Sequence, residues 1–203
     1  MIPFNERGLF EMIGGKDAAN ARLDAFFHKP DGSWAVTESG GLHAELNNEP
    51  SIETPWLYDF SGQPWKTQET VRQVLNTIWT NTPKGMPGND DLGEMSSWYV
   101  WSAMGMYPEI PGRAELVLGS PLFPEIRIHR PAGDIVIRSG GAATDAPYVQ
   151  ALKVNGKSTS KTWLPEAFLK AGGTVDFVLS STPDKHWGTS ADDAPPSFSP
   201  ASK

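Results

Sequence analysis

The sequence predicts an α+β protein in which helices precede strands, with a boundary near Gly112. Apolar residues recur at helical spacing in residues 1–112, whereas residues 113–203 hold short β-branched runs separated by turn residues. Acidic residues concentrate in the first part, which holds 7 Lys and Arg against 15 Asp and Glu, compared with 10 against 9 in the second. We therefore expect a helical region, 1–112, and a strand-rich region, 113–203.

The helical region contains several segments with a clear helical pattern. Asn5 suits the N-cap of the first, NERGLFEMI, and the second is KDAANARLDAFF. The third, QPWKTQETVRQVLNTIW, places aliphatic residues at i, i+3, i+4 and i+7, namely Val71, Val74, Leu75 and Ile78. The fourth, EMSSWYVWSAMGMY, is apolar on nearly every side, which is typical of a helix that is buried all round.

The second region reads as a series of strands. The segments AELVLG, EIRIH and DIVIRS are alternating or β-branched, and GTVDFVLS forms a later strand. YVQALKV runs into Asn155-Gly156, a strong hairpin signal. The tail SADDAPPSFSPASK is rich in Pro and Ser, so we expect it to be frayed.

Composition excludes several classes of function. A net charge of −7 makes nucleic acid an unsuitable partner, because neutralising phosphates needs a basic face. No apolar run approaches the roughly 18 residues that span a membrane, and the absence of cysteine excludes disulfides and thiolate metal sites. Six of the eight tryptophans lie in the acidic first part. Carboxylates bond hydroxyl groups and indole rings pack on sugar faces, so this part suits a sugar or a cation.

Two adjacent carboxylates, Asp90 and Asp91, lie between glycines in GNDDLGEMSSWY. Asp91 and Glu94 have the spacing of a capping box, so one interpretation is that the pair caps the following helix. The other is a functional site, because glycine lets the backbone approach a ligand closely. Two carboxylates at a helix start can bind a metal ion or orient a water molecule as general base. These residues alone leave both interpretations open.

A second oxygen-rich stretch is NNEP, residues 47–50. It fits an Asx-turn that leads into a helix, and it also fits a site for a hard cation or for sugar hydroxyl groups. Nearby, Glu53 and Asp59 are interpreted as solvated charges. His43 is interpreted as a structural, hydrogen-bonded histidine.

Longer segments around these residues carry a family resemblance. NNEPSIETPWLYDFSGQPWKTQETVR, residues 47–72, and GMPGNDDLGEMSSWYVWSAMGMYPEIPG, residues 85–112, resemble the two signature blocks of glycoside hydrolase family 92. LVLGSPLFPEIRI, residues 116–128, and MIPFNERGLFEMIGG, residues 1–15, resemble neighbouring segments of that family. Its members are exo-acting, calcium-dependent α-mannosidases. The resemblance covers essentially the whole chain, and such long matches are specific.

The resemblance implies a fold and a reaction. The family fold is a β-sandwich followed by an (α/α)₆ toroid and further strands. Residues 1–112 would then be the C-terminal part of the toroid, and residues 113–203 an antiparallel β-sheet or sandwich region. The reaction is inverting hydrolysis of α-linked mannose, with α-1,2 linkages expected. One carboxyl group protonates the leaving oxygen, and a carboxylate activates water on the opposite face of the sugar.

The resemblance also implies roles for individual residues. Asp90 and Asp91 carry the base role, although which of the two activates water stays open. Asn48 and Glu49 contact the sugar, and together with Asp90 they hold Ca²⁺, the expected cofactor. The expected partner is a mannose-containing glycan, and the family suggests a secreted or cell-envelope location.

Two departures from the family pattern affect these expectations. The family's acid glutamate lies in a motif that this chain lacks, and Glu6 and Glu11 read as helix-surface charges. Phe4-Asn5 stands where the family often has His-Asp. We therefore expect a fragment that lacks the general acid and is inactive by itself. The alternatives are a carbohydrate- or calcium-binding module without catalysis, and a structural module that associates through an exposed toroid face.

Overall fold

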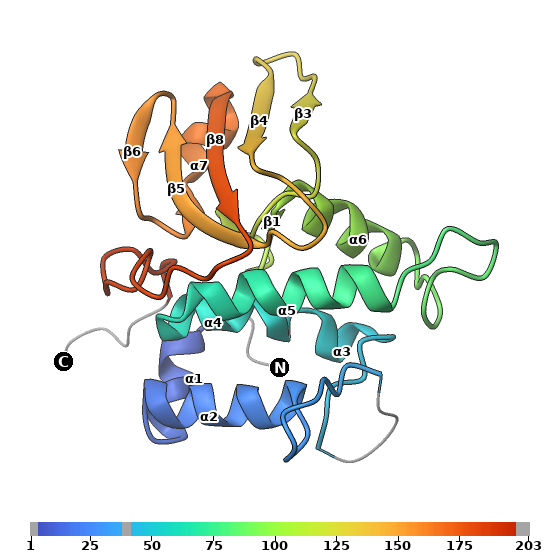
Figure 1. Ribbon diagram of the computed structural model, residues 1–203. Coiled ribbons are helices and arrows are strands. Elements are labelled where there is room, and N and C mark those ends of the chain that lie inside the picture. The colour runs from blue at the N-terminus through green and yellow to red at the C-terminus, as the bar shows by residue number, and fades with distance from the viewer. Residues whose placement is uncertain (1–3, 38–41, 198–203) are drawn as a thin grey trace.

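The computed structural model describes residues 4–37 and 42–197, and it places most helices below the sheets (Figure 1). The predicted α+β class is confirmed, and the helices precede the strands except for α7, which lies between β7 and β8. The helices are α1 (Glu6–Met12), α2 (Lys16–Phe27), α3 (Glu49–Ile52), η1 (Thr54–Trp56), α4 (Leu57–Ser61), α5 (Pro64–Thr77), α6 (Glu94–Met104) and α7 (Glu166–Ala171). The strands are β1 (Met106–Tyr107), β2 (Leu116–Leu118), β3 (Glu125–Ile128), β4 (Ile135–Gly140), β5 (Tyr148–Val154), β6 (Lys157–Thr159), β7 (Trp163–Leu164) and β8 (Gly173–Ser180).

The strands form two sheets. A three-stranded sheet has the order β1-β2-β7, and a five-stranded sheet has the order β3-β4-β8-β5-β6. All neighbouring strands are antiparallel except β4 and β8, which run parallel with Ile135 opposite Gly173. The helix α7 precedes β8 and so supplies part of the crossover that a parallel pair requires.

Local sequence signals explain most helix boundaries. Asn5 Oδ1 accepts a hydrogen bond from Gly8 N at 3.1 Å, which confirms Asn5 as the cap of α1. The fourth predicted helix is shorter than its apolar run, because Gly105 adopts φ +76° and ends α6 before β1 begins. None of the helices in residues 4–37 and 42–197 has both the length and the apolar character needed to cross a membrane.

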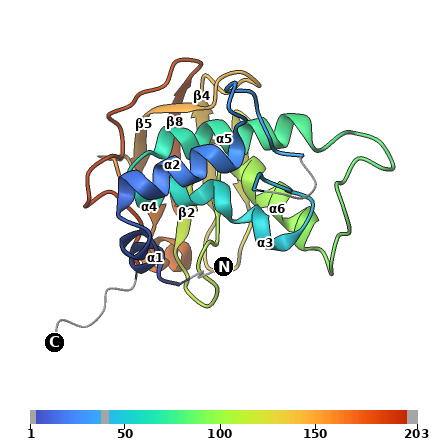
Figure 2. The ribbon, with the colours of Figure 1, turned by 90° about the horizontal axis from the view of Figure 1, so that it is seen from below.

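The helix α5 lies between the sheets and the lower helices and ties them together (Figure 1). Its lower side contacts α4, which in turn packs against α2 (Figure 2). Its upper side holds the sheet region through side chains that include Gln68 and Arg72. Gln68 Oε1 accepts from Val149 N at 3.0 Å, and the Arg72 guanidinium donates to Ser120 O, Ser120 Oγ, Pro121 O, Ala143 O and Thr144 O.

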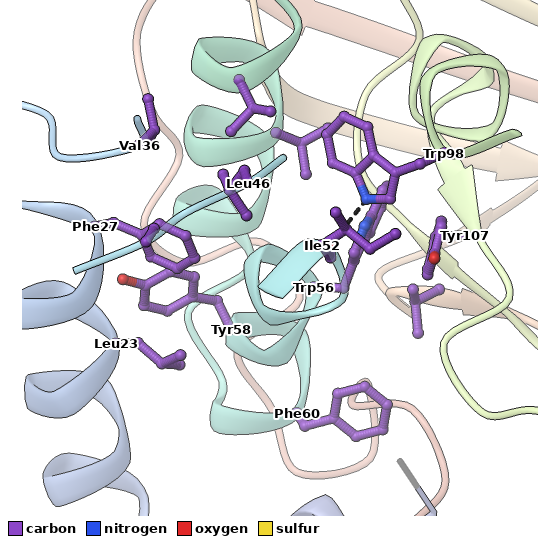
Figure 3. Close-up of a cluster of buried hydrophobic side chains, with 14 of the residues drawn as sticks. Leu23, Phe27, Val36, Leu46, Ile52, Trp56, Tyr58, Phe60, Trp98 and Tyr107 are labelled. Atoms are coloured by element: carbon purple, nitrogen blue, oxygen red, sulfur yellow. Dashed lines mark hydrogen bonds between the residues drawn. The ribbon is translucent and has the colours of Figure 1, made fainter. Parts of the chain in front are cut away.

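Large aromatic side chains fill the core between the helices (Figure 3). Trp56, Tyr58, Trp98 and Phe27 are each almost completely buried. The Trp56 ring stacks on Tyr107 with centroids 5.3 Å apart, which connects the helical core to β1. A second cluster, centred on Ile137, lies against the sheets.

The C-terminal tail packs against the rest of the molecule up to residue 197, so the prediction that it frays is wrong for residues 190–197. Trp187 is buried against the sheet cluster, and Asp193 O accepts from Thr162 N at 2.9 Å. Ser197 Oγ accepts from Arg7 N at 3.0 Å and donates to Glu6 Oε2 at 3.2 Å. The tail therefore covers the start of α1.

The fully buried carboxyl group of Asp59 makes stability depend on pH. Burial raises the pKa of Asp59 well above its usual range, while the Thr67 hydroxyl lowers it in part. Because the folded state holds this proton more tightly than the unfolded state, its contribution is complete below about pH 4 and is lost as pH rises. Asp59→Asn, which stays neutral, is expected to match the wild type near pH 4 and to exceed its free energy of unfolding by about 2 kcal/mol at pH 8.

Urea unfolding at several pH values measures this difference. Asp192→Asn, at an exposed tail position, is the control and should follow the wild-type pH dependence. A difference between Asp59→Asn and wild type that does not change with pH would contradict the expectation.

Candidate functional site

The two oxygen-rich stretches singled out in the sequence lie side by side. Gly88, in the loop before α6, approaches the backbone before α3 so closely that an added Cβ would stand 2.0 Å from Asn47 O. Gly88 also has φ +61°, which favours glycine. The indole Nε1 of Trp98 in α6 donates to Ile52 O at the end of α3, at 2.7 Å (Figure 3). These two contacts hold both ends of α3 against the segment that contains Gly88 and α6.

A polar cleft of about 470 Å³ opens between the two stretches. Of the four residues predicted to form the site, Asn48 lines this cleft, and Glu49, Asp90 and Asp91 are sequence neighbours of its lining residues. The lining residues are Glu45, Asn47, Asn48, Pro50, Ser51, Gly88 and Asn89. The cleft has the amide and carboxylate groups that bind sugar hydroxyls.

The twin aspartates point to different partners. Asp90 Oδ1 accepts from Ser96 N at 2.8 Å, and Asp90 O accepts from Gly93 N at 3.0 Å, so the side chain of Asp90 caps the first turn of α6 from outside its N-cap residue, Gly93. The interpretation of Asp91 and Glu94 as a capping box is therefore wrong, because the side chain of Asp90, and not that of Asp91, accepts the hydrogen bond from the first turn of α6.

Asp91 instead lies within hydrogen-bonding reach of Glu49. That contact raises the pKa of Glu49, and the charges of Asp91 and Glu94 act in the same direction. The two negative charges repel, which favours the protonated form of Glu49. Glu49 and Asp91 therefore form a pair of adjacent carboxyl groups.

A strained turn separates the two aspartates. Asp91 and Leu92 have φ of 42° and 62°, a left-handed region that costs a residue with a Cβ about 1–2 kcal/mol. The Leu92 side chain is fully exposed, so packing of this side chain does not offset the cost. Strain of this kind clusters at ligand sites. Here it turns one carboxylate toward the helix and the next toward Glu49.

Further carboxyl groups lie behind this pair, and sequence reasoning missed them. Burial raises the pKa of Glu53 to about 7, with the charges of Glu94 and Glu6 adding to the shift. Glu109 is fully buried, and burial together with the charge of Glu53 raises its pKa well above the usual range. The interpretation of Glu53 and Asp59 as solvated charges is thus wrong, and so is that of Glu6, which is buried. The spacing of Glu53, four residues or about one helical turn after Glu49, was one sequence signal that the two carboxyl groups lie on the same side of a helix.

The residues present supply only part of a calcium site. Oxygen ligands such as the carboxylates of Glu49 and Asp91 suit Ca²⁺, which takes 6–8 of them. However, within the described ranges no group of three or more histidine, aspartate or glutamate side chains is arranged to hold a metal ion. These residues by themselves do not build a complete calcium centre.

The close approach of Gly88 to Asn47 gives a test of how the site is assembled. Gly88→Ala is expected to lower the free energy of unfolding by about 2–5 kcal/mol, because the methyl group adds overpacking to left-handed strain. Thermal unfolding with circular dichroism measures the loss.

Gly112→Ala is the matched control. Gly112 has φ +80°, and an added Cβ there would meet nothing within 4 Å. Its cost is therefore that of the backbone alone, about 1–2 kcal/mol. Equal losses for the two variants would show that Gly88 does not hold the two loops together.

Comparison with known proteins adds a family to this geometry. Residues 1–181 match the model of the glycosyl hydrolase family 92 catalytic domain. A curated relative from Arthroderma benhamiae, named an uncharacterized secreted glycosidase, is 29% identical over 201 residues. That alignment covers 97% of this chain and 24% of the relative.

Solved structures give the same result. The family GH92 α-mannosidase BT3965 from Bacteroides thetaiotaomicron superposes with a TM-score of 0.87 at 30% identity, over 98% of this chain and 26% of BT3965. The family GH92 inverting mannosidase BT2199 from the same species superposes with a TM-score of 0.84 at 35% identity, over 97% of this chain and 28% of BT2199. The chain spans about a quarter of the length of these relatives. It belongs to glycosyl hydrolase family 92, a family of glycoside hydrolases that includes α-mannosidases.

Proposed function

We propose that this chain forms part of the catalytic site of an inverting α-mannosidase in which Asp91 is the general base. The observation that carries the proposal is the division of the twin aspartates. Asp90 is occupied at the start of α6, whereas Asp91 pairs with Glu49 on a strained turn. The naming of BT2199 as an inverting mannosidase, at 35% identity, supports this reaction class.

In the proposed reaction Asp91 takes a proton from water while the water oxygen attacks the anomeric carbon of mannose. The glycosidic bond breaks, and its oxygen receives a proton from an acidic group within hydrogen-bonding distance, whose carboxyl lies about 6.5–9.5 Å from that of Asp91. The family resemblance gives that acid to a motif that residues 1–203 do not contain. We therefore propose that the chain alone turns substrate over far more slowly than a complete family member.

Asn48 and Glu49 are proposed to bind the hydroxyl groups of the sugar, and α-1,2-linked mannose is the proposed substrate. Ca²⁺ is the proposed cofactor. Glu49 and Asp91 would contribute ligands, and others are needed to complete its coordination. Asp90, expected as a ligand, already gives one oxygen to Ser96 N. Secretion is the proposed location, supported by the name of the Arthroderma relative.

A second candidate is a module that binds or associates without catalysis. An apolar groove of about 200 Å³ runs between α1 and α2, with Leu9, Ile13 and Phe26 on its walls. Met12 and Ile13 of the same region are exposed. Such a face suits contact with further helices, which favours association with another polypeptide segment.

The isolated chain distinguishes these proposals. With Ca²⁺ and α-1,2-mannobiose, we expect turnover at least 10²-fold below that of BT3965, because general acid catalysis contributes about 10²–10⁴-fold. Calorimetry is expected to detect Ca²⁺ binding that weakens as pH falls, since the Glu49 proton competes with the cation. Light scattering on the same sample tests association. Turnover equal to that of BT3965 would contradict the proposed lack of an acid, and identical Ca²⁺ binding by Asp91→Asn would contradict the proposed ligand.

A further inference from the structure

A second hollow, of about 490 Å³, lies at the C-terminal end of α2 and shares no lining residue with the cleft described above. Its walls include the side chains of Asp24, His28, Lys29, His43 and Lys66. Four of these five can carry a positive charge, whereas residues 1–112 as a whole hold 15 Asp and Glu against 7 Lys and Arg and two His. The hollow is therefore a locally basic place in an acidic part of the chain.

Backbone carbonyl groups fix both imidazole rings of this hollow. His28 Nδ1 lies 3.2 Å from Asp24 O, and His43 Nδ1 lies 3.1 Å from Ala25 O, both at the end of α2. A carbonyl oxygen can only accept, so Nδ1 of each ring carries the hydrogen. The His28 ring is also packed on Trp34, with centroids 4.2 Å apart. Each ring therefore takes up a second proton at Nε2, on the edge away from the carbonyl.

The one acidic side chain in the wall is already neutralised. Lys66 Nζ lies 2.8 Å and 2.6 Å from the two carboxylate oxygens of Asp24. The Tyr58 hydroxyl donates to Asp24 Oδ1 at 2.9 Å, and burial holds the pKa of Tyr58 well above its usual range, so this donor stays protonated. Asp24 thus positions Lys66 and offers little acceptor capacity to a ligand.

These features select one class of ligand. Among the described residues, no group of three or more His, Asp or Glu side chains is arranged to hold a metal ion. A neutral sugar needs acceptors as well as donors, and the acceptors of Asp24 are in use. An anion with several oxygens needs donors, and it would itself favour the protonated imidazoles.

We propose that this hollow binds a phosphate group, either free or on a sugar, through the Nε2–H groups of protonated His28 and His43, with the Lys66 ammonium held in the same wall by Asp24. Binding is coupled to proton uptake, because each imidazole donates from Nε2 only when it is charged. Charged and titratable groups on the surrounding elements are Asp24, Lys29, Asp31, Glu45, Tyr58, Lys66 and Glu69.

The four histidines of the chain allow a direct test by NMR. Inorganic phosphate is expected to shift the ring resonances of His28 and His43 at constant ionic strength, because the anion contacts their Nε2–H groups. His129 and His186 lie outside the hollow and serve as internal controls. Equal shifts of all four histidines, or no shift in any of them, would overturn the proposal.

Variants identify the binding atoms. His28→Asn with His43→Asn keeps a donor near each Nδ1 position and removes Nε2, so the affinity for phosphate is expected to fall about tenfold or more. His129→Asn, at an exposed ring, should leave the affinity unchanged. Binding measurements with mannose 6-phosphate and with mannose show whether the hollow recognises the phosphate group or the sugar. Binding by phosphate and mannose 6-phosphate but not by mannose supports the proposal, and binding by mannose alone overturns it.

Discussion

Replacing Asp91, the proposed general base, with asparagine is expected to lower turnover of the proposed substrate α-1,2-mannobiose by about 10²–10⁴-fold in a chimeric enzyme, the usual contribution of a general base. The amide keeps the size of the side chain but cannot take a proton from water. Asp90→Asn is the matched variant. It should retain most of the activity, because asparagine still offers an oxygen to Ser96 N and is itself a good helix cap.

This measurement needs a chimera, because the chain alone is proposed to turn substrate over slowly. This chain would replace the segment of BT3965 on which it superposes, 26% of that enzyme, with a TM-score of 0.87. The wild-type chimera gives the reference rate, and melting temperatures show that both variants are folded. Equal losses of turnover in the two variants, or a larger loss at Asp90, would reject Asp91 as the base.

Replacing Arg72 with methionine is expected to lower the free energy of unfolding by about 3–5 kcal/mol. The side chain is 3% exposed and donates to acceptors in two separate loops of the sheet region. Burial lowers the pKa of Arg72 to about 10, so the guanidinium is still charged near neutral pH. Methionine fills similar space but leaves buried carbonyl oxygens without donors. Urea denaturation measures the loss.

Two further variants show whether geometry causes this effect. Arg72→Lys keeps the charge but not the planar fork of donors, so it is expected to recover less than half of the loss. Arg138→Met removes an exposed arginine that pairs with Glu125 and Asp176, and should cost less than about 1 kcal/mol. Similar losses for Arg72→Met and Arg138→Met would show that Arg72 does not join the two regions.

Periodicity and caps predicted the parts of the fold that local sequence controls. The pattern of Val71, Val74, Leu75 and Ile78 predicted α5. Pro64 at its first turn and the apolar face both favour a helix there. The Asn155-Gly156 turn predicted the hairpin of β5 and β6. The parallel pairing of β4 with β8, by contrast, joins segments that are distant in sequence, and no local pattern specifies it.

The candidate site divides in the same way. Motifs brought Asn48, Glu49, Asp90 and Asp91 into one hypothesis, and the structure places their two loops together. Which aspartate caps α6 depends on two left-handed residues, and neither Asp91 nor Leu92 is a glycine that would signal such a turn. The burial of Glu53 depends on packing between distant elements, so composition gave no measure of it.

The contact between Ser197 and Glu6 joins residues that are 191 positions apart. Its consequence concerns the order of folding during synthesis. At about 5–20 residues per second, a ribosome adds the closing serine roughly 10–40 s after α1 is made. Throughout that interval Glu6 lacks its contact with Ser197, so α1 reaches its final environment only when residues up to 197 have been added. This long-range closure raises the contact order of the chain and predicts slow completion of folding.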